Sequence, residues 1–467
     1  MNRYIYWLAA SGVTLTAFAV AAAGAPAATI ASPAGLGCQA SMSKAIPQPA
    51  LEQLDAAGLG DVPLAPNTAR RDLVAAPFSN STAVTNALFP IRHLASAILN
   101  GRVDDKVFNT ETTLLSFTQI VEWTPGQCVR VLVSQYMAFL DGRLEETAID
   151  FYAQANDGSV WYLGESVFDY DEAGLIITTD GTWHAGLEGP AAMIMPADPR
   201  IGDAYRPENI PGIVFEELRV TRINQTFDGP SGPISGVMVG IETHQDGSTS
   251  EKVFAPGYGE LLSTTGRNFE AMALASPTDS RPGGVPDELV RISKGADSIF
   301  ASKLVTLKEW TRARTIARRM LEAWEAFRTG DVPPRLVEPT DVALRNLVAR
   351  VASRNRSETY SASIAASYAS NDLQLRYQPV TNIDLMRFEL WVRRALVDAT
   401  NHSLAGVRSD LVTLEWIRDR IAHTLTPLTL TAVDTLVRDL GTAVRDEDLM
   451  AAAQVARDLR EIMDDII

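Results

Sequence analysis

The sequence predicts an α+β multidomain protein, in which an antiparallel β-meander is followed by an all-α antiparallel helical bundle. Three observations lead to this prediction. Residues 82–276 alternate apolar and polar side chains between frequent turn signals, which is the period of half-buried strands. Residues 298–467 repeat apolar side chains at helical spacing instead. A stretch rich in proline and glycine lies between the two patterns.

The length and the charge of the chain restrict its class. With 467 residues, of which 46% are hydrophobic and 21% charged, the chain is long enough for more than one hydrophobic core. Residues 299–467 contain 23 basic and 23 acidic residues, so residues 1–298 carry the whole net charge of −16. Such a region repels phosphate groups, which argues against a nucleic-acid partner. It is compatible with simple solubility or with holding cations.

The first 28 residues have the order of a secretory signal peptide. Arg3 precedes an uncharged apolar run over residues 5–23, and small residues follow it. We expect cleavage after Ala25, Ala27 or Ala28, and therefore a secreted or cell-envelope protein. An uncleaved membrane anchor is the alternative, because the apolar run just reaches spanning length. We expect no membrane span after removal of the signal.

Residues 29–81 are rich in alanine, proline and glycine and show little periodicity, so we expect a mostly irregular lead-in. The chain has two cysteines, Cys38 and Cys128. Export permits a disulfide between them. The alternatives are lipidation of Cys38 and two free thiols, and the sequence leaves the choice open.

Turn signals divide residues 82–276 into about ten strands. Asp-Gly pairs or related turn sequences occur at residues 141–142, 156–158, 172–174 and 246–247. Asp-Gly between alternating apolar runs is the strongest short-range signal for a hairpin. Consecutive hairpins make a meander, so we expect a curved sheet, a sandwich or an open barrel.

The helical bundle follows a linker that we place at residues 277–297. Half of residues 277–286 are proline or glycine. Beyond the linker we expect about five to seven helices, because prolines separate segments with apolar stripes at helical spacing. The clearest stripes are Trp310, Ala313, Ala317, Met320, Leu321, Trp324 and Phe327; Leu411, Leu414, Ile417 and Ile421; and Leu449, Ala452, Ala456, Leu459 and Met463.

The usual signatures of enzymes are absent from the sequence. It contains no glycine-rich phosphate loop, no paired-histidine zinc motif, no Cys-x-x-Cys and no Gly-x-Ser-x-Gly. The sequence therefore favours a binding or structural module over an enzyme and leaves the question of catalysis open. No cofactor is predicted.

One hairpin places candidate ligand-binding side chains together. If Asp157-Gly158 is a two-residue turn, Asp150 lies directly opposite Glu165. The same face then carries the remaining candidates, Tyr152, Gln154 and Trp161. The other face is apolar, and we assign it to the core with Phe151, Ala153, Ala155, Val160, Tyr162 and Gly164.

The opposed carboxylates have three interpretations. Two carboxylates about 5 Å apart repel each other, so the pair is expected to lie in water at the open end of the hairpin. A shared cation or another polar ligand between Asp150 and Glu165 is the second interpretation. The third is catalysis, because retaining glycosidases use carboxylates at this spacing.

Two further groups resemble metal ligands. Asp169, Asp171 and Asp180 match part of a calcium loop, but Ala173 replaces a needed oxygen and strands flank the segment. We therefore expect an ordinary hairpin turn there, with calcium as the ion if any ion binds. His402 and His423 could meet inside the bundle and hold a metal or a cofactor.

The hairpin region resembles a known family. Asp150-Phe-Tyr-Ala-Gln, Asp157-Gly-x-Val-Trp-Tyr-x-Gly-Glu165, Gly181-x-Trp-x-Ala-Gly186 and Ala255-Pro-Gly-x-Gly259 look like motifs of exported bacterial proteins described as hypothetical or lipoprotein-like, with a WYAQD…GNVWYFGE signature. The resemblance covers about residues 139–262. Phe151 and Ala155 stand where that family has tryptophan and aspartate. The resemblance implies export and a β-sheet domain, and no reaction.

These observations favour an exported, non-enzymatic module that binds a small ligand, a cation or an envelope protein on the concave face of its β region. The first alternative is an extracellular hydrolase, possibly glycan-directed, that uses Asp150 and Glu165. The second is metal or cofactor binding within the bundle. The bundle itself is expected to serve docking or self-association, and the sequence leaves the oligomeric state open.

Overall fold

The computed structural model describes residues 39–40 and 42–467 of the chain. The predicted signal peptide and Cys38 lie outside the described residues. Cys128 is disulfide-bonded. Within the described ranges, no helix combines the length and the apolar character needed to cross a membrane.

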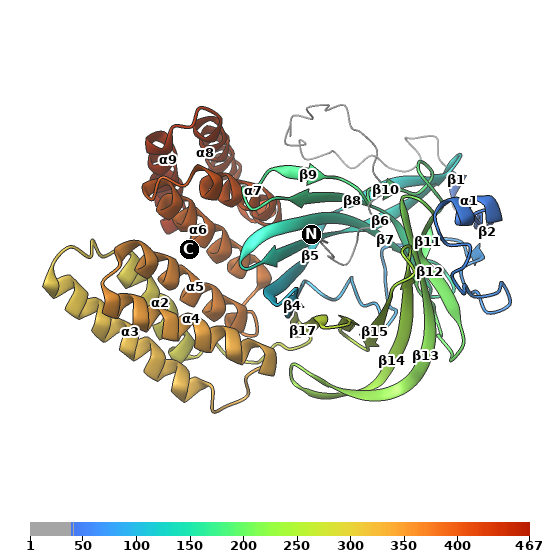
Figure 1. Ribbon diagram of the computed structural model, residues 1–467, viewed down its shortest axis with the longest axis horizontal. Coiled ribbons are helices and arrows are strands. Elements are labelled where there is room, and N and C mark those ends of the chain that lie inside the picture. The colour runs from blue at the N-terminus through green and yellow to red at the C-terminus, as the bar shows by residue number, and fades with distance from the viewer. Residues whose placement is uncertain (1–38, 41) are drawn as a thin grey trace.

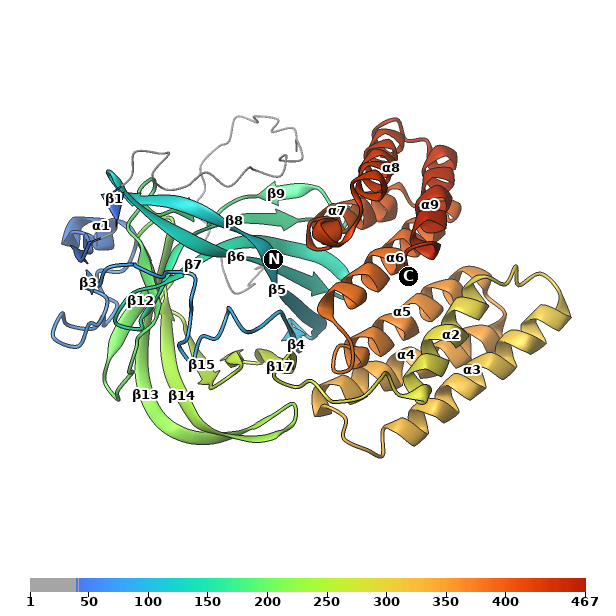
Figure 2. The same ribbon diagram turned by 180° about the vertical axis from the view of Figure 1, so that it is seen from behind.

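The β domain is one strongly curved antiparallel sheet built from two meanders (Figures 1 and 2). The first meander consists of β4 (Ser96–Val103), β5 (Lys106–Thr124), β6 (Gln127–Leu140), β7 (Arg143–Gln154) and β8 (Val160–Tyr170). The second consists of β12 (Ala204–Ile210), β13 (Val214–Gly229), β14 (Gly232–His244), β15 (Thr249–Ala255), β16 (Gly259–Thr265) and β17 (Asn268–Ser276). The first strand, β4, pairs with the last, β17, and so joins the two meanders.

Curvature brings the two ends of this sheet together. Three short strands pair with β8, namely β9 (Ile176–Thr178), β10 (Trp183–His184) and β11 (Ala192–Met195). The chain passes from β11 directly into β12 at the other end of the sheet. There Glu165 of β8 lies beside Glu208 of β12. Among the shapes expected for the meander, the sheet is therefore closest to an open barrel.

The lead-in is mostly irregular, as predicted, but it is packed into the β domain. It contains β1 (Gln39–Ala40), β2 (Lys44–Ala45), α1 (Leu51–Ala56) and β3 (Val74–Ala75). Residues 76–95 then cross the concave side of the sheet as an irregular segment with several turns (Figure 2). Its apolar side chains belong to the largest core of the domain, among them Phe78, Val84 and Ile91. The concave side is consequently covered.

The C-terminal region contains eight α-helices and a short 3₁₀ helix, η2 (Ala422–Thr424). The α-helices are α2 (Asp287–Phe300), α3 (Leu307–Phe327), α4 (Pro334–Ser353), α5 (Arg356–Gln374), α6 (Val380–Thr400), α7 (Leu404–Ile421), α8 (Pro427–Arg445) and α9 (Leu449–Asp464). This is one α-helix more than the five to seven expected, because α2 begins inside the segment predicted as a linker. The buried face of α3 is the predicted stripe, including Trp310, Met320 and Trp324.

The segment predicted as a linker, residues 277–297, is shorter than expected. Helix α2 begins at Asp287, because the proline and glycine residues end there and two acidic residues favour the start of a helix. The remaining part, residues 277–286, is held by hydrogen bonds to the β domain. Asp279 is fully buried and accepts hydrogen bonds from the hydroxyls of Tyr258 and Ser231. The connection between the sheet and the bundle is therefore held at its centre.

Candidate functional site

A cavity of about 220 Å³ lies inside the curved sheet, and we call it the acidic chamber. Both meanders and the lead-in segment around Phe89 form its walls. Seven carboxylate side chains line it, and these are Glu146, Asp150, Glu165, Glu216, Glu242, Glu260 and Glu270. The only basic side chain among the lining residues is Lys252. Part of the acidic side chains of residues 1–298 therefore lies inside the β domain and not on its surface.

The β7–β8 hairpin supplies the first two of these carboxylates. Asp150 pairs directly with Glu165, which confirms the predicted opposition. The turn itself differs from the prediction, because the backbone N–H of Ala155 bonds to the carbonyl of Ser159 and leaves a three-residue loop. Gly158 has a positive φ of 93°, as such loops require. A bulge between Asp150 and Tyr152 compensates for the extra residue and restores the opposition.

The changed register changes which side chains face the chamber. Beyond the bulge Tyr152 pairs with Tyr162, and their rings stack at 4.9 Å between centroids. Tyr162, which we had assigned to the core, lines the chamber and donates a hydrogen bond of 2.7 Å to Asp150. Trp161 pairs with Ala153, is fully buried and does not line the chamber.

Gln154 is the other predicted ligand residue that does not line the chamber. Its Oε1 accepts hydrogen bonds from the backbone N–H groups of Thr85 and Asn86. Gln154 therefore fixes the lead-in to the end of the hairpin. Of the five residues predicted to bind a ligand, the structure brings Asp150, Tyr152 and Glu165 together in the chamber.

The opposed carboxylates are buried and do not lie in water, contrary to the prediction. Asp150 is 6% exposed and Glu165 is 4% exposed, because the second meander and the lead-in cover the hairpin. Burial raises the pKa of Asp150 to about 7, against the effect of the hydrogen bond from Tyr162. Burial raises the pKa of Glu165 to about 8, and repulsion from Asp150 adds to it.

Glu208 of β12 completes a group of three carboxylates, and we call Asp150, Glu165 and Glu208 the unpaired group. Glu208 is 1% exposed, and burial and repulsion from Glu165 raise its pKa well above the ordinary value. Among the described residues, no donor bonds to Oε1 of Glu165 or of Glu208. The two carboxyl groups can bond to each other only if one carries a proton. No ion pair within the described chain reaches any of the three.

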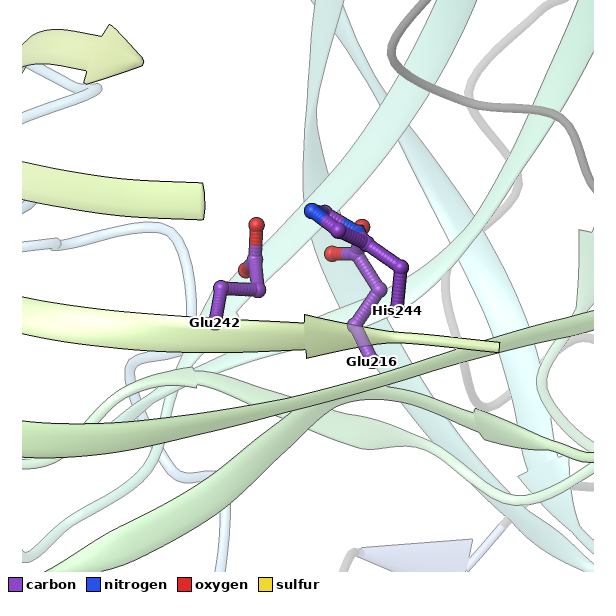
Figure 3. A group of neighbouring side chains, drawn as sticks. All are labelled: Glu216, Glu242 and His244. Atoms are coloured by element: carbon purple, nitrogen blue, oxygen red, sulfur yellow. The ribbon is translucent and has the colours of Figure 1, made fainter. Parts of the chain in front are cut away.

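A second group in the chamber does have basic partners (Figure 3). Donor atoms of Glu216, Glu242 and His244 lie within 4.8 Å of one another. His244 Nδ1 is 2.8 Å from Glu216 Oε1, and Nε2 is 3.0 Å from the hydroxyl of Ser250. Lys252 Nζ lies 3.5 Å from a Glu242 oxygen. We call Glu216, Glu242, His244 and Lys252 the paired group.

Charge compensation acts on the pKa values of the paired group. Burial lowers the pKa of His244, but the bond to Glu216 and its charge outweigh burial, so the pKa of His244 is raised. Burial and the charge of Glu216 raise the pKa of Glu242 to about 7, while Lys252 and His244 act in the opposite direction. Neighbouring carboxylates thus favour the charged forms of both basic groups.

The other predicted metal ligands do not assemble. Asp171 Oδ1 accepts hydrogen bonds from the backbone N–H groups of residues 173 and 175 and closes a hairpin turn. Burial and the charge of Asp180 raise the pKa of Asp169 to about 6. His402 and His423 are exposed at the ends of α6 and α7. In the part of the chain that the structure describes, the paired group holds the only three such donors within reach of one ion.

The sequence contains a signal for the carboxylates that the prediction missed. Glu216 lies between Val214 and Leu218 on one face of its strand, and an acid at an apolar position of the alternation indicates a buried polar site. Glu208 carries no such local signal, because Pro207 interrupts its strand pattern.

Comparison with known proteins adds no relative. No protein-family model matches the chain, and no curated protein matches it either.

Proposed function

We propose that the β domain is a binding module whose acidic chamber takes up a cationic ligand. The observation that carries this proposal is the burial of Asp150, Glu165 and Glu208 together without a basic partner. A buried ionised carboxylate is costly unless a counter-charge or hydrogen-bond donors accompany it. A cation in the chamber supplies that counter-charge.

Protons take the place of the ligand when the chamber is free. The raised pKa values of Asp150 and Glu165, about 7 and about 8, mean that these groups hold protons at neutral pH. A cation favours the ionised forms, so its binding releases protons. Affinity therefore rises as the pH increases from about 6 to about 8.

Hydrolysis is less well supported by the same geometry. A retaining glycosidase needs one ionised nucleophile beside one protonated acid, and the pKa values of about 7 for Asp150 and about 8 for Glu165 leave both groups protonated below neutral pH. The chamber of about 220 Å³ is also smaller than ordinary ligand pockets of roughly 300–1,000 Å³. A small cation fits this space better than a glycan.

Export belongs to the same proposal. The order of residues 1–28 and the resemblance of residues 139–262 to exported bacterial proteins support a secreted or cell-envelope location. The ligand is then one that the protein meets outside the cytoplasm.

Thermal unfolding and calorimetry of the intact protein test the proposal. At pH 8 we expect calcium, magnesium, manganese, putrescine or spermidine chloride to raise the Tm, since a ligand at about 100 times its Kd stabilises by about 2.7 kcal/mol. Titration in buffers of different ionisation enthalpy should show proton release. Glu165→Gln should abolish the shift.

Glu172→Gln is the matched control, because Glu172 is exposed in the turn after β8. This variant should respond as the unaltered protein does. If no metal cation and no amine raises the Tm of the unaltered protein at pH 8, the proposal is wrong.

A further inference from the structure

We infer that the cation is an organic amine with two or more ammonium groups, such as a diamine or polyamine, and not a bare metal ion. This inference rests on the proposed function and specifies its ligand. It is carried by the placement of the carboxylates, the aromatic walls and the way in which the chamber holds Lys252.

The carboxylates are dispersed around the wall and do not converge on one point. They come from β7, β8, β13, β14, β16 and β17. A metal ion needs ligand atoms that meet at one centre, but in the described chain the unpaired group does not offer three such donors within reach of one ion. Dispersed carboxylates match charges that are spaced along a chain.

The residues between the carboxylates suit a ligand with methylene groups. Tyr152 and Tyr162 stack against each other, and Phe89 packs edge-on against Tyr152 at 5.0 Å. Tyr136 also lines the chamber; burial raises its pKa, and the charges of Glu270, Glu146 and further carboxylates add to this effect. Aromatic faces attract ammonium groups and pack against their aliphatic stems. A small hard metal ion gains its affinity from oxygen ligands instead.

The paired group shows that the chamber already holds an alkylammonium ion. Lys252 Nζ lies 3.5 Å from Glu242 and 3.3 Å from Glu260. The charges of these carboxylates outweigh burial and raise the pKa of Lys252. Lys252 lies against Glu242, and Glu242 belongs with Glu216 and His244 to the only three donors of the described chain that lie within reach of one ion (Figure 3). Asp150 and Glu165 line the chamber and lack such a partner, so they are left for the ammonium groups of the ligand.

Calorimetric titration of the intact protein at pH 8 tests this inference. The probes are putrescine, spermidine and n-butylamine, with calcium, manganese and zinc chloride as the metal arm. We expect putrescine to bind at least tenfold more tightly than n-butylamine, because the two share a four-carbon chain but differ in the number of charges. Glu165→Gln should weaken putrescine binding at least tenfold, and Glu172→Gln should leave it unchanged.

Tyr152→Leu tests the aromatic wall separately from the charges. It should weaken putrescine binding and leave the response to metal ions unchanged, with circular dichroism confirming that each variant is folded. Binding of a metal ion without binding of either polyamine overturns this inference and leaves the proposed function standing. Binding of neither class overturns both. Equal affinity for putrescine and n-butylamine contradicts the requirement for two ammonium groups.

Discussion

The buried charged side chains of this protein differ in whether a basic side chain lies beside each carboxylate, and two places show the contrast. In the interface between sheet and bundle, Glu111 of β5 meets Arg387 of α6 and Arg420 of α7. In the acidic chamber, Asp150 and Glu165 meet no basic side chain. We call the first set of residues, together with Asp384, the interface cluster.

The interface cluster keeps its central carboxylate ionised. Arg420 Nη1 lies 2.6 Å and Arg387 Nη1 lies 3.2 Å from Glu111 Oε2, and Tyr368 donates a hydrogen bond to the other oxygen. Burial raises the pKa of Glu111, but the charges of Arg387 and Arg420 outweigh burial and hold the pKa below its ordinary value. In the chamber no basic side chain opposes the desolvation of Asp150 and Glu165, and their pKa values rise.

The presence or absence of a basic partner distinguishes buried charges with a structural role from those to which we assign a binding role. A buried charge that the chain itself neutralises joins two elements, here β5 with α6 and α7. A buried charge that the chain leaves without a partner is a place for a ligand. Under the proposed function, burial alone does not identify a site, and the missing counter-charge does.

The largest expected effect comes from removing a counter-charge from the interface cluster. Arg387→Ala should lower the free energy of unfolding by about 3–5 kcal/mol, because it leaves Glu111 buried with only part of its compensation. Urea unfolding followed by circular dichroism measures this loss. It should affect the sheet and the bundle together, since the cluster joins them.

Arg350→Ala is the matched control for that variant. Arg350 forms an ion pair of 2.6 Å with Glu358, but both side chains are about half exposed. The loss should be about 0–1 kcal/mol. Similar losses in the two variants would remove the distinction on which the comparison depends.

An opposite effect is expected in the chamber. Glu165→Gln should stabilise the ligand-free protein by about 1–3 kcal/mol at pH 8, because it removes a carboxylate that must ionise without a partner. Chemical unfolding of both proteins at pH 5 and pH 8 measures the difference, which should be small at pH 5.

The pH dependence follows from the sign of the pKa shifts. The carboxyls of Asp150, Glu165, Glu242 and Glu270 have pKa values of about 7, 8, 7 and 7 in the folded protein, and ordinary values near 4 in the unfolded chain. The unfolded state releases these protons first, so stability falls as the pH rises from about 4 to about 8. Glu111 acts in the other direction, since its lowered pKa adds stability that is lost only in acid. A ligand-free protein that gains stability between pH 6 and pH 8 would contradict this assignment.

The division into a β region and a helical region could be predicted because it depends on local periodicity. The alternation around β6 and β7 and the stripe on α3 each indicate an element without knowledge of its neighbours. The pairing of β4 with β17 could not be predicted in this way. It joins segments more than 150 residues apart, and neither strand carries a local signal for its partner.

For the candidate site, too, the local features could be predicted from the sequence and the tertiary contacts could not. The opposition of Asp150 and Glu165 follows from one hairpin, so the sequence predicts it. Their burial depends on β12 and on the lead-in, which only the tertiary fold places over them. The predicted orientation of Trp161 was wrong because the additional loop residue shifts β8 by one position between the loop and the bulge, so the side chains of β8 there change faces while Tyr152 of β7 does not.

The smallest expected effect concerns the acidic turn that resembles a calcium loop, and it tests whether acidity alone makes a site. Asp171→Ala removes the acceptor for the backbone N–H groups of residues 173 and 175, so it should cost about 0.5–1 kcal/mol. It should leave the response to putrescine and calcium unchanged, because Asp171 already serves its own turn and does not line the chamber. Thermal unfolding with and without each cation measures both quantities. A cation-induced rise in Tm that disappears in Asp171→Ala but persists in Glu165→Gln would place the binding site in this turn and not in the chamber. The conclusion that a missing counter-charge identifies the ligand site would then be wrong.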